Sequence, residues 1–197
     1  MGDSNVNLAS LIGSRICHDL ISPIGAITNG LELLDLTGSA EGPEMELIAD
    51  SVGNAGARIR FFRIAYGAAG DQMMGRPEVA SVLDDLTRGG RLVVKWGPLE
   101  AQPRAEVRLA FLALQCLETA MPYGGNVQIA VEDGQWSVSG NAKKLNINQG
   151  LWDFTGKTDN VEITPALVQF ALLPAVATDV GRVPKMAHDG TRITLRF

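Results

Sequence analysis

The chain has 197 residues, of which 46% are hydrophobic and 20% charged, with a formal net charge of −5 and a pI of about 5.0. This composition is typical of a folded protein and excludes a disordered chain or a basic surface for nucleic acid. No apolar stretch approaches the roughly 20 residues that a membrane-spanning helix needs. Cys17 and Cys116 lie far apart without a metal or redox spacing, so we expect a cytoplasmic protein that binds neither nucleic acid nor membrane.

The first part of the chain predicts an antiparallel pair of helices over residues 4–36 and 44–68. Apolar residues recur every three or four positions in both segments, and in the second segment the steps alternate as in a heptad repeat. Gly38, Gly42 and Pro43 mark the connection. Because two helices cannot enclose a core, we expect two such hairpins to form a dimeric four-helix bundle. The alternative is that the hairpin packs on its own C-terminal domain.

The pattern changes near residue 70, and we expect domains at 1–70 and 78–197 joined by a linker at 71–77. The second domain is predicted to mix helices and strands in this order: a helix over 78–87, a strand over 92–96, a helix over 105–120, strands over 126–132 and 135–139, a helix over 164–178 interrupted by Pro174, and strands over 183–187 and 192–197. Asp133-Gly134 and Asp189-Gly190 lie where the two strand pairs turn. These elements predict a sheet covered by helices, and the whole chain an α+β fold.

The first helix carries His18, one of two histidines in the chain. The other, His188, lies beside a predicted turn, and we expect an ordinary exposed residue there. Helical geometry turns His18 about 200° away from the apolar positions Ile16 and Leu20. The residues spaced by three, four or seven from His18 share its face, and they are Leu11, Ser14, Arg15, Ile21, Ser22 and Gly25. Their mixture of apolar, small and hydrogen-bonding groups favours a docking surface over a solvated face.

An exposed imidazole can act as a nucleophile at neutral pH. Asp19 can orient the ring proton of His18, Arg15 can pair with phosphate oxygens, and Ser22 can bond a phosphoryl group or a water molecule. Pro23 lacks the N–H that would bond the carbonyl of Asp19, so it predicts a helix kink next to His18 that costs about 3 kcal/mol. On composition alone, a His-Asp pair on a helix is more often an ordinary pair than a site.

The stretch 14–27 resembles the phosphorylation motif of bacterial sensor histidine kinases, in which histidine, an acidic residue, leucine, two variable residues and proline open a dimerising hairpin. The elements after Pro77 resemble, in order, the α/β ATP-binding domain of that family. The nucleotide motifs themselves are missing. Thr119 stands at the position of a magnesium-binding asparagine, residues 139–143 replace the motif whose aspartate reads adenine, and residues 161–166 contain no glycine to cradle phosphates.

This combination is similar to the bacterial histidine phosphotransferases of the ChpT type, which are dimers with a degenerate kinase domain. The resemblance implies that His18 accepts a phosphoryl group from the receiver domain of a hybrid histidine kinase and passes it to response regulators. It also implies that this chain binds no ATP, cofactor or metal, and that the receiver supplies Mg²⁺. The alternatives are an ATP-dependent histidine kinase with divergent motifs, a non-catalytic dimeric docking protein for receiver domains, and a phosphatase acting on a regulator.

Overall fold

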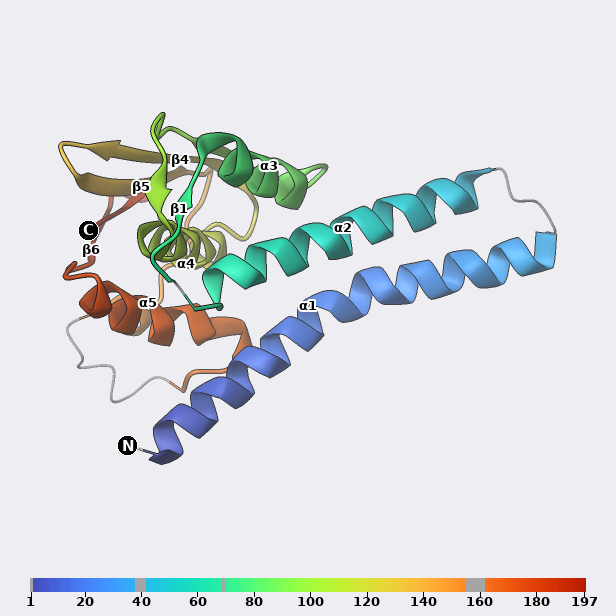
Figure 1. The fold of residues 1–197 in the computed structure, drawn as a ribbon, viewed down its shortest axis with the longest axis horizontal. Coiled ribbons are helices and arrows are strands. Elements are labelled where there is room, and N and C mark those ends of the chain that lie inside the picture. The colour runs from blue at the N-terminus through green and yellow to red at the C-terminus, as the bar shows by residue number, and fades with distance from the viewer. Residues whose placement is uncertain (1, 38–41, 69, 155–161) are drawn as a thin grey trace.

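The computed structural model describes residues 2–37, 42–68, 70–154 and 162–197, which form an α+β fold (Figure 1). The α-helices are α1 (Gly2–Thr37), α2 (Pro43–Ala65), α3 (Arg76–Thr87), α4 (Arg104–Ala120) and α5 (Val168–Asp179), and two short 3-10 helices are η1 (Gln149–Leu151) and η2 (Pro165–Leu167). The strands are β1 (Met73–Met74), β2 (Leu92–Trp96), β3 (Gln102–Pro103), β4 (Gly125–Glu132), β5 (Gln135–Asn141), β6 (Lys185–His188) and β7 (Arg192–Arg196). The predicted fold class, a helical hairpin followed by an α/β domain, is confirmed. Gly38 and Val161, on which two of the predictions rest, lie outside the described residues.

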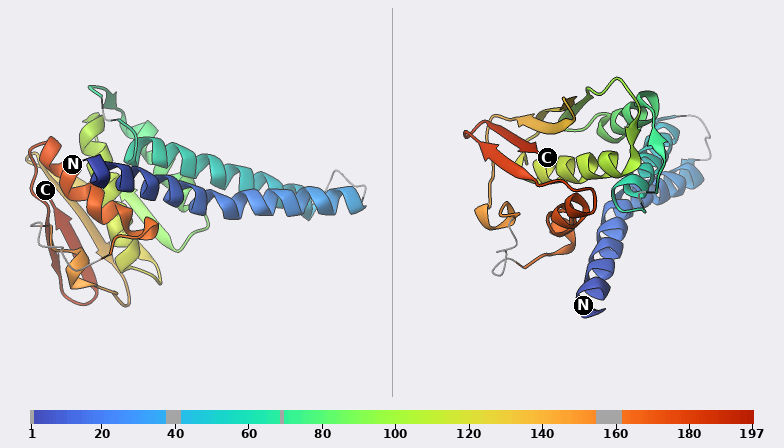
Figure 2. Two further views of the ribbon diagram at one scale, coloured as in Figure 1. Left: turned by 90° about the horizontal axis from the view of Figure 1, so that it is seen from below. Right: turned by 60° about the vertical axis from the view of Figure 1, so that its left-hand side comes forward.

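Helices α1 and α2 run antiparallel and project together from the C-terminal domain (Figures 1 and 2). Their close approach depends on Gly30 of α1, which is buried: a Cβ at this position would lie 2.6 Å from Cγ1 of Ile48 on α2. The missing side chain therefore lets the second helix pack directly on the backbone of the first. Pro43 stands at the start of α2, as predicted. None of the described helices has the length and apolar character needed to cross a bilayer.

Helix α1 continues through Pro23, which is buried. Figure 1 shows the helix changing direction between the half that runs beside α5 and the half that pairs with α2. Pro23 provides a physical cause for this bend, because its ring removes one backbone hydrogen bond inside the helix. The bend lets one helix contact the C-terminal domain at one end and α2 at the other.

The larger sheet has the strand order β2-β4-β5-β7-β6, in which β2 and β4 are parallel and the other neighbours are antiparallel. Helix α4 connects the two parallel strands. Asp133 and Gly134 both have positive φ, at 50° and 75°, which gives the tight two-residue turn predicted between β4 and β5. At the second turn, the Asp189 carboxylate accepts hydrogen bonds from the backbone N–H groups of Thr191 and Arg192.

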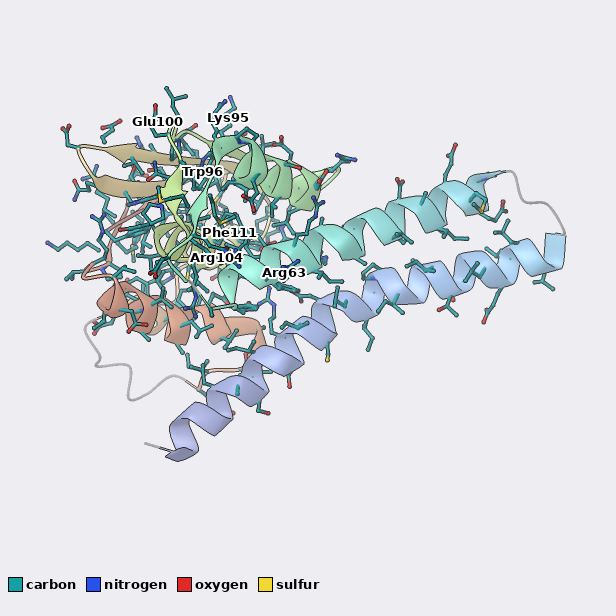
Figure 3. All side chains as sticks on the ribbon, viewed as in Figure 1. Arg63, Lys95, Trp96, Glu100, Arg104 and Phe111 are labelled. Atoms are coloured by element: carbon teal, nitrogen blue, oxygen red, sulfur yellow. The ribbon has the colours of Figure 1, made fainter. Side chains whose placement is uncertain are left out.

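The core lies between this sheet and the helices α4 and α5. Side chains alternate along β2, where Leu92, Val94 and Trp96 are buried and the residues between them are exposed. Helix α4 is buried over most of its length, with Phe111 completely enclosed (Figure 3). Because this helix also contacts α2, the same core that folds the C-terminal domain anchors the hairpin.

Two predicted boundaries differ from the structure at the junction between the hairpin and the domain. The segment predicted as a linker contains β1, which pairs with β3, and α3 already begins at Arg76. Helix α2 ends at Ala65, before the predicted residue 68. There Arg104 donates hydrogen bonds from Nη2 to the Arg63 carbonyl (2.7 Å) and from Nε to the Ala68 carbonyl (3.2 Å) (Figure 3). The first bond occupies a carbonyl in the last turn of α2, and the second holds the segment that follows the helix.

The predicted helix over 164–178 is wrong in its details. The 3-10 helix η2 comes first, and α5 then runs from Val168 to Asp179 without stopping at Pro174. A proline removes only one hydrogen bond, and burial of α5 against α4 outweighs that loss. The following strand begins at Lys185, two residues later than predicted, while β7 begins at Arg192 as predicted.

The hairpin divides into two parts that differ in their surroundings. Near the C-terminal domain, Leu11 and Ile16 of α1 and Phe61 and Phe62 of α2 pack against the domain core. The far half instead exposes the large apolar side chains of Ile24, Leu31, Met45 and Val52 to between 42% and 55% of their surface, and Ile59, nearer the domain, is 47% exposed. One end of the hairpin thus packs on its own domain, as in the alternative considered above. The predicted dimeric four-helix bundle stays a prediction.

Candidate functional site

His18 lies on α1 near the junction with the C-terminal domain, and 82% of its side chain is exposed. Its Nδ1 atom is 3.0 Å from Oδ1 of Asp19. Because an ionised carboxylate can only accept hydrogen bonds, this contact favours the tautomer with the proton on Nδ1. In the neutral ring the other nitrogen, Nε2, then holds a free lone pair. The predicted outward orientation of His18 is confirmed, and its neighbour favours one tautomer.

Asp19 contacts other residues besides His18, and only 11% of its side chain is exposed. The Nε of Arg15, one turn earlier on α1, donates to Oδ2 of Asp19 at 2.8 Å. Across the hairpin, Nη1 of Arg58 on α2 is 3.8 Å from the same oxygen, and its Nε donates to Asn54 Oδ1 at 2.9 Å. Oδ2 therefore faces two guanidinium groups, while Oδ1 faces the imidazole. The arginine side chains thus hold the carboxylate through Oδ2, and Oδ1 remains available to orient the imidazole.

Two clefts meet at His18. The larger, about 500 Å³, lies between the hairpin and the C-terminal domain, and Arg58, Arg88, Arg91 and Glu118 are among the residues that line it. The smaller, about 480 Å³, follows the hairpin past Ser22 and Pro23 toward the exposed half. The imidazole is therefore accessible to another molecule from both clefts.

The structure separates the predicted face into two sets. His18, Ser14, Ile21, Ser22 and Gly25 are exposed, and the Ile21 side chain shows 71% of its surface. A Cβ on Gly25 would meet no atom within 4 Å, so this position opens on free space. These exposed residues surround the imidazole, and the small ones among them let another molecule approach it closely.

Leu11 and Arg15 belong to the same helical face but turn toward the C-terminal domain. Leu11 is half-buried and packs against the domain core. The Arg15 guanidinium bonds both Asp19 and, through Nη1, the carbonyl of Ala166 at 2.8 Å. Its predicted pairing with phosphate oxygens stays a prediction, since these contacts use two of its donor groups.

Four residues of the larger cleft were not predicted as site residues: Arg58, Arg88, Arg91 and Glu118. In the cleft wall, Arg91 Nη2 is 3.3 Å from Glu118 Oε1. A signal for Arg58 was present: counting outward along both helices from their connection places this residue opposite His18 and Asp19 in an antiparallel hairpin. No comparable signal exists for the others, because they come from distant parts of the chain and meet only through the tertiary fold.

The three segments that resemble degenerate nucleotide motifs gather around α4. Gln169 Nε2 of α5 donates to Thr119 Oγ1 at 3.0 Å and to the Ala166 carbonyl at 3.1 Å. A Cβ on Gly140 of β5 would lie 2.4 Å from Sδ of Met121, so this segment packs directly on the end of α4. Hydrogen bonds and direct packing thus connect these segments to α4 and α5.

Aromatic side chains pack together around Phe170, the residue that follows Gln169 on α5. The ring of Trp152 lies 5.1 Å from that of Phe170 on α5 and 5.9 Å from that of Phe154, and both Trp152 and Phe170 are at least 95% buried. Within the described part of the chain, no group of three His, Cys, Asp or Glu side chains is arranged to hold a metal ion. His188 lies exposed on β6, where it pairs with Ile193 of β7.

Comparisons with known proteins agree with this architecture. Residues 76–192 match the family model described as the histidine phosphotransferase C-terminal domain. Protein phosphotransferase ChpT of Brucella abortus (strain 2308) is 39% identical over 132 residues, which cover 66% of this chain and 63% of that protein, just under two thirds of its length. A solved structure of a bacterial phosphotransferase is 31% identical, with a TM-score of 0.80 over 97% of this chain and 95% of the other. This chain therefore belongs to the family defined by the histidine phosphotransferase C-terminal domain.

Proposed function

We propose that this chain is a histidine phosphotransferase of a cytoplasmic phosphorelay. His18 accepts a phosphoryl group from the aspartyl phosphate of a receiver domain in a hybrid histidine kinase and passes it to the aspartate of a response regulator. The observation that carries the proposal is the imidazole itself, which is 82% exposed and bonded through Nδ1 to Asp19. Such a ring presents Nε2 to a partner, and family membership supports the reaction class.

The transfer is an in-line displacement at phosphorus. The lone pair of His18 Nε2 forms the N–P bond while the P–O bond to the receiver aspartate breaks, and that carboxylate leaves with the bonding electrons. The ring becomes cationic, and Asp19 stabilises it through the Nδ1–H hydrogen bond. In the second half-reaction, an acceptor carboxylate attacks phosphorus and the N–P electrons return to Nε2. The Mg²⁺ that neutralises the phosphoryl oxygens comes with the receiver.

The chain needs no nucleotide for this reaction, and we propose that it binds none. Hydrogen bonds within the protein support this part of the proposal. Gln169 bonds Thr119 and the Ala166 carbonyl, which belong to two of the three segments that resemble nucleotide motifs, and the buried ring of Phe170 follows it on α5. The same region lacks the glycine-rich backbone that usually cradles phosphates.

We also propose that the working unit is a homodimer. The hairpin exposes Ile24 and Leu31 on α1 and Met45, Val52 and Ile59 on α2. Those on each helix recur at seven-residue spacing, the repeat that pairs helices into bundles. Association of two hairpins would bury this face and complete a four-helix bundle. It would also leave both copies of His18 facing outward.

Two labelled donors test the proposed function. The full chain is incubated with a receiver domain carrying a radiolabelled aspartyl phosphate, and separately with labelled ATP and Mg²⁺. We expect rapid labelling from the receiver and none from ATP. The His18→Gln variant should accept no label, and the His188→Gln variant, which alters the only other histidine, should match the natural chain. Label on the His18→Gln variant, or labelling from ATP, would overturn the proposal.

A further inference from the structure

A chain of hydrogen bonds runs from the interior of the C-terminal domain to the imidazole of His18. It begins at Gln169, whose side chain is completely buried in the first turn of α5. The two hydrogens of its amide nitrogen are both used, one on Thr119 Oγ1 at 3.0 Å and the other on the Ala166 carbonyl at 3.1 Å. Thr119 in turn donates to the Gln115 carbonyl at 3.1 Å, which fixes its hydroxyl on α4.

The Ala166 carbonyl joins the domain to the hairpin. It accepts one hydrogen bond from Gln169 inside the domain and another from Nη1 of Arg15 on α1, at 2.8 Å. A carbonyl oxygen has two lone pairs, so both of its acceptor sites are filled. Figures 1 and 2 show α1 running beside α5 at this point, and both η2 and α5 contact the helix. The orientation of this carbonyl therefore limits where the Arg15 guanidinium can lie.

The restricted position of Arg15 in turn restricts Asp19. Its guanidinium is planar, and its Nε donates to Asp19 Oδ2 at 2.8 Å while Nη1 is held by Ala166. Only 16% of the Arg15 side chain and 11% of the Asp19 side chain are exposed, so neither has room for many other positions. Asp19 uses its remaining oxygen on His18 Nδ1. With Arg15 in place, the carboxylate can point only one oxygen at the imidazole.

We propose that Gln169 and Thr119 are positioning residues for His18. Through the Ala166 carbonyl and Arg15 they hold Asp19 in the orientation that keeps the proton on Nδ1 and leaves Nε2 free to attack phosphorus. The C-terminal domain thus contributes to the transfer reaction without touching the phosphoryl group. This inference rests on the proposed function for its kinetic consequence, but the state of the imidazole can be measured without any partner.

The test uses the full chain with histidine labelled with ¹⁵N, and long-range proton–nitrogen NMR spectra at alkaline pH, where a neutral ring has one protonated nitrogen. His18 and His188 are distinguished with the His188→Gln variant. In the natural chain we expect a protonated Nδ1 and an unprotonated Nε2 on His18. Gln169→Met, which keeps the length of the side chain but removes its amide, should move both nitrogen signals toward the average of the two tautomers.

The kinetic part measures phosphoryl transfer from a labelled receiver at increasing receiver concentration. We expect the saturating rate to fall about tenfold in Gln169→Met, the factor that corresponds to one buried hydrogen bond. The receiver concentration at half-maximal rate should stay unchanged, because the exposed surface around Ile21 and Gly25 is not altered. A residue with a purely structural role would leave the His18 nitrogen signals where they are.

Three further variants keep the test valid if Gln169→Met does not fold. Thr119→Val removes the hydroxyl and keeps the shape, and should act like Gln169→Met, whereas Thr119→Ser restores the hydroxyl and should restore the signals. Arg15→Lys keeps the charge, but one ammonium cannot reproduce the planar fork, so the signals should shift again. Thr194→Val is the matched control, since its hydroxyl bonds Ser139 within the sheet at 3.1 Å, outside this chain of hydrogen bonds.

Unchanged His18 signals in folded Thr119→Val and Arg15→Lys variants would overturn the positioning role, whatever their transfer rates. The opposite combination separates the two proposals. If the natural chain accepts no phosphoryl group while the His18 signals still respond to Thr119→Val, the positioning role stands and the proposed function fails.

Discussion

The ring of Phe61 on α2 lies parallel to the ring of Phe111 on α4, with centroids 4.8 Å apart and planes inclined by 8°. Both side chains are at most 2% exposed. This stacked pair joins the base of the hairpin to the core of the C-terminal domain. The packing of these two rings therefore helps to hold the hairpin against the C-terminal domain.

We expect Phe61→Ala to lower the free energy of unfolding by about 3–5 kcal/mol, the usual loss for a large aromatic side chain removed from a packed interior. Urea denaturation followed by circular dichroism measures this change. Val93→Ala on β2, where 53% of the side chain is exposed, is the matched control and should change stability by less than about 1 kcal/mol. A loss for Phe61→Ala as small as that of the control would show that the two parts are not packed as described.

Stability should fall in alkaline solution, partly because of Tyr66. Burial raises the pKa of the Tyr66 hydroxyl above its ordinary value of 10.0, although the nearby Arg15 acts in the opposite direction. Above pH 10 the unfolded chain loses this proton before the folded chain does. The unfolded state then binds fewer protons, so the free energy of unfolding decreases as pH rises, by at most about 1.4 kcal/mol per pH unit for one group.

Tyr66→Phe should remove this part of the pH dependence, and urea denaturation at several pH values between 9 and 11 measures it. Tyr123→Phe, at a tyrosine that is 76% exposed, is the control and should keep the natural slope. Cys116 remains in both variants. Burial raises its thiol pKa well above 9.0, so a decline starting near that pH should persist. Identical slopes for Tyr66→Phe and the natural chain would contradict the raised pKa of the Tyr66 hydroxyl.

Gly25 should be needed for docking and not for folding. The position is open, and a leucine there would rise above the surface beside His18. We expect Gly25→Leu to raise the receiver concentration for half-maximal transfer about tenfold, equivalent to about 1.4 kcal/mol of docking energy. Thermal stability should not fall, because leucine favours a helix more than glycine does.

Gly13→Leu is the matched control for this docking experiment. Gly13 is also open and on α1, but a step of five residues places it about 140° around the helix from His18. Transfer rates with labelled receiver should be normal for this variant. Equal effects of the two substitutions would show that the exposed face around His18 is not the docking surface.

Val52→Asp should convert the proposed dimer to a folded monomer. The Val52 side chain is 54% exposed in a single chain, so the new charge disturbs little within that chain but would be buried between two hairpins. Sedimentation equilibrium gives the molecular mass directly. Leu99→Asp, at a side chain that is 76% exposed on the C-terminal domain, should leave the dimer intact. A natural chain that sediments as a monomer at all concentrations would rule out the dimer.

The sequence was informative where structure follows local patterns. The strand at Leu92–Trp96 and the turn at Asp133-Gly134 are both observed as predicted, and the two turn residues tolerate positive φ. The exposure of His18 follows from helical periodicity in the same way. These features depend on neighbours within a few residues, which the sequence displays directly.

Features that depend on distant partners were not predictable. β1 consists of two residues paired with a segment about 30 positions later, and no local pattern marks it. The early end of α2 depends on Arg104, and the orientation of Asp19 depends on Arg15 together with Ala166. Long-range hydrogen bonds of this kind are set by how helices pack, and a single sequence does not display that packing.

The position of the phosphoryl group on the imidazole tests the central claim most directly. After transfer from a phosphorylated receiver, ¹⁵N-labelled chain can be examined for nitrogen–phosphorus coupling under alkaline conditions, where phosphohistidine is stable. The Nδ1 contact with Asp19 predicts phosphorylation of His18 at Nε2, with the proton kept on Nδ1. Phosphate on Nδ1, on His188, or on a residue other than histidine would contradict the account.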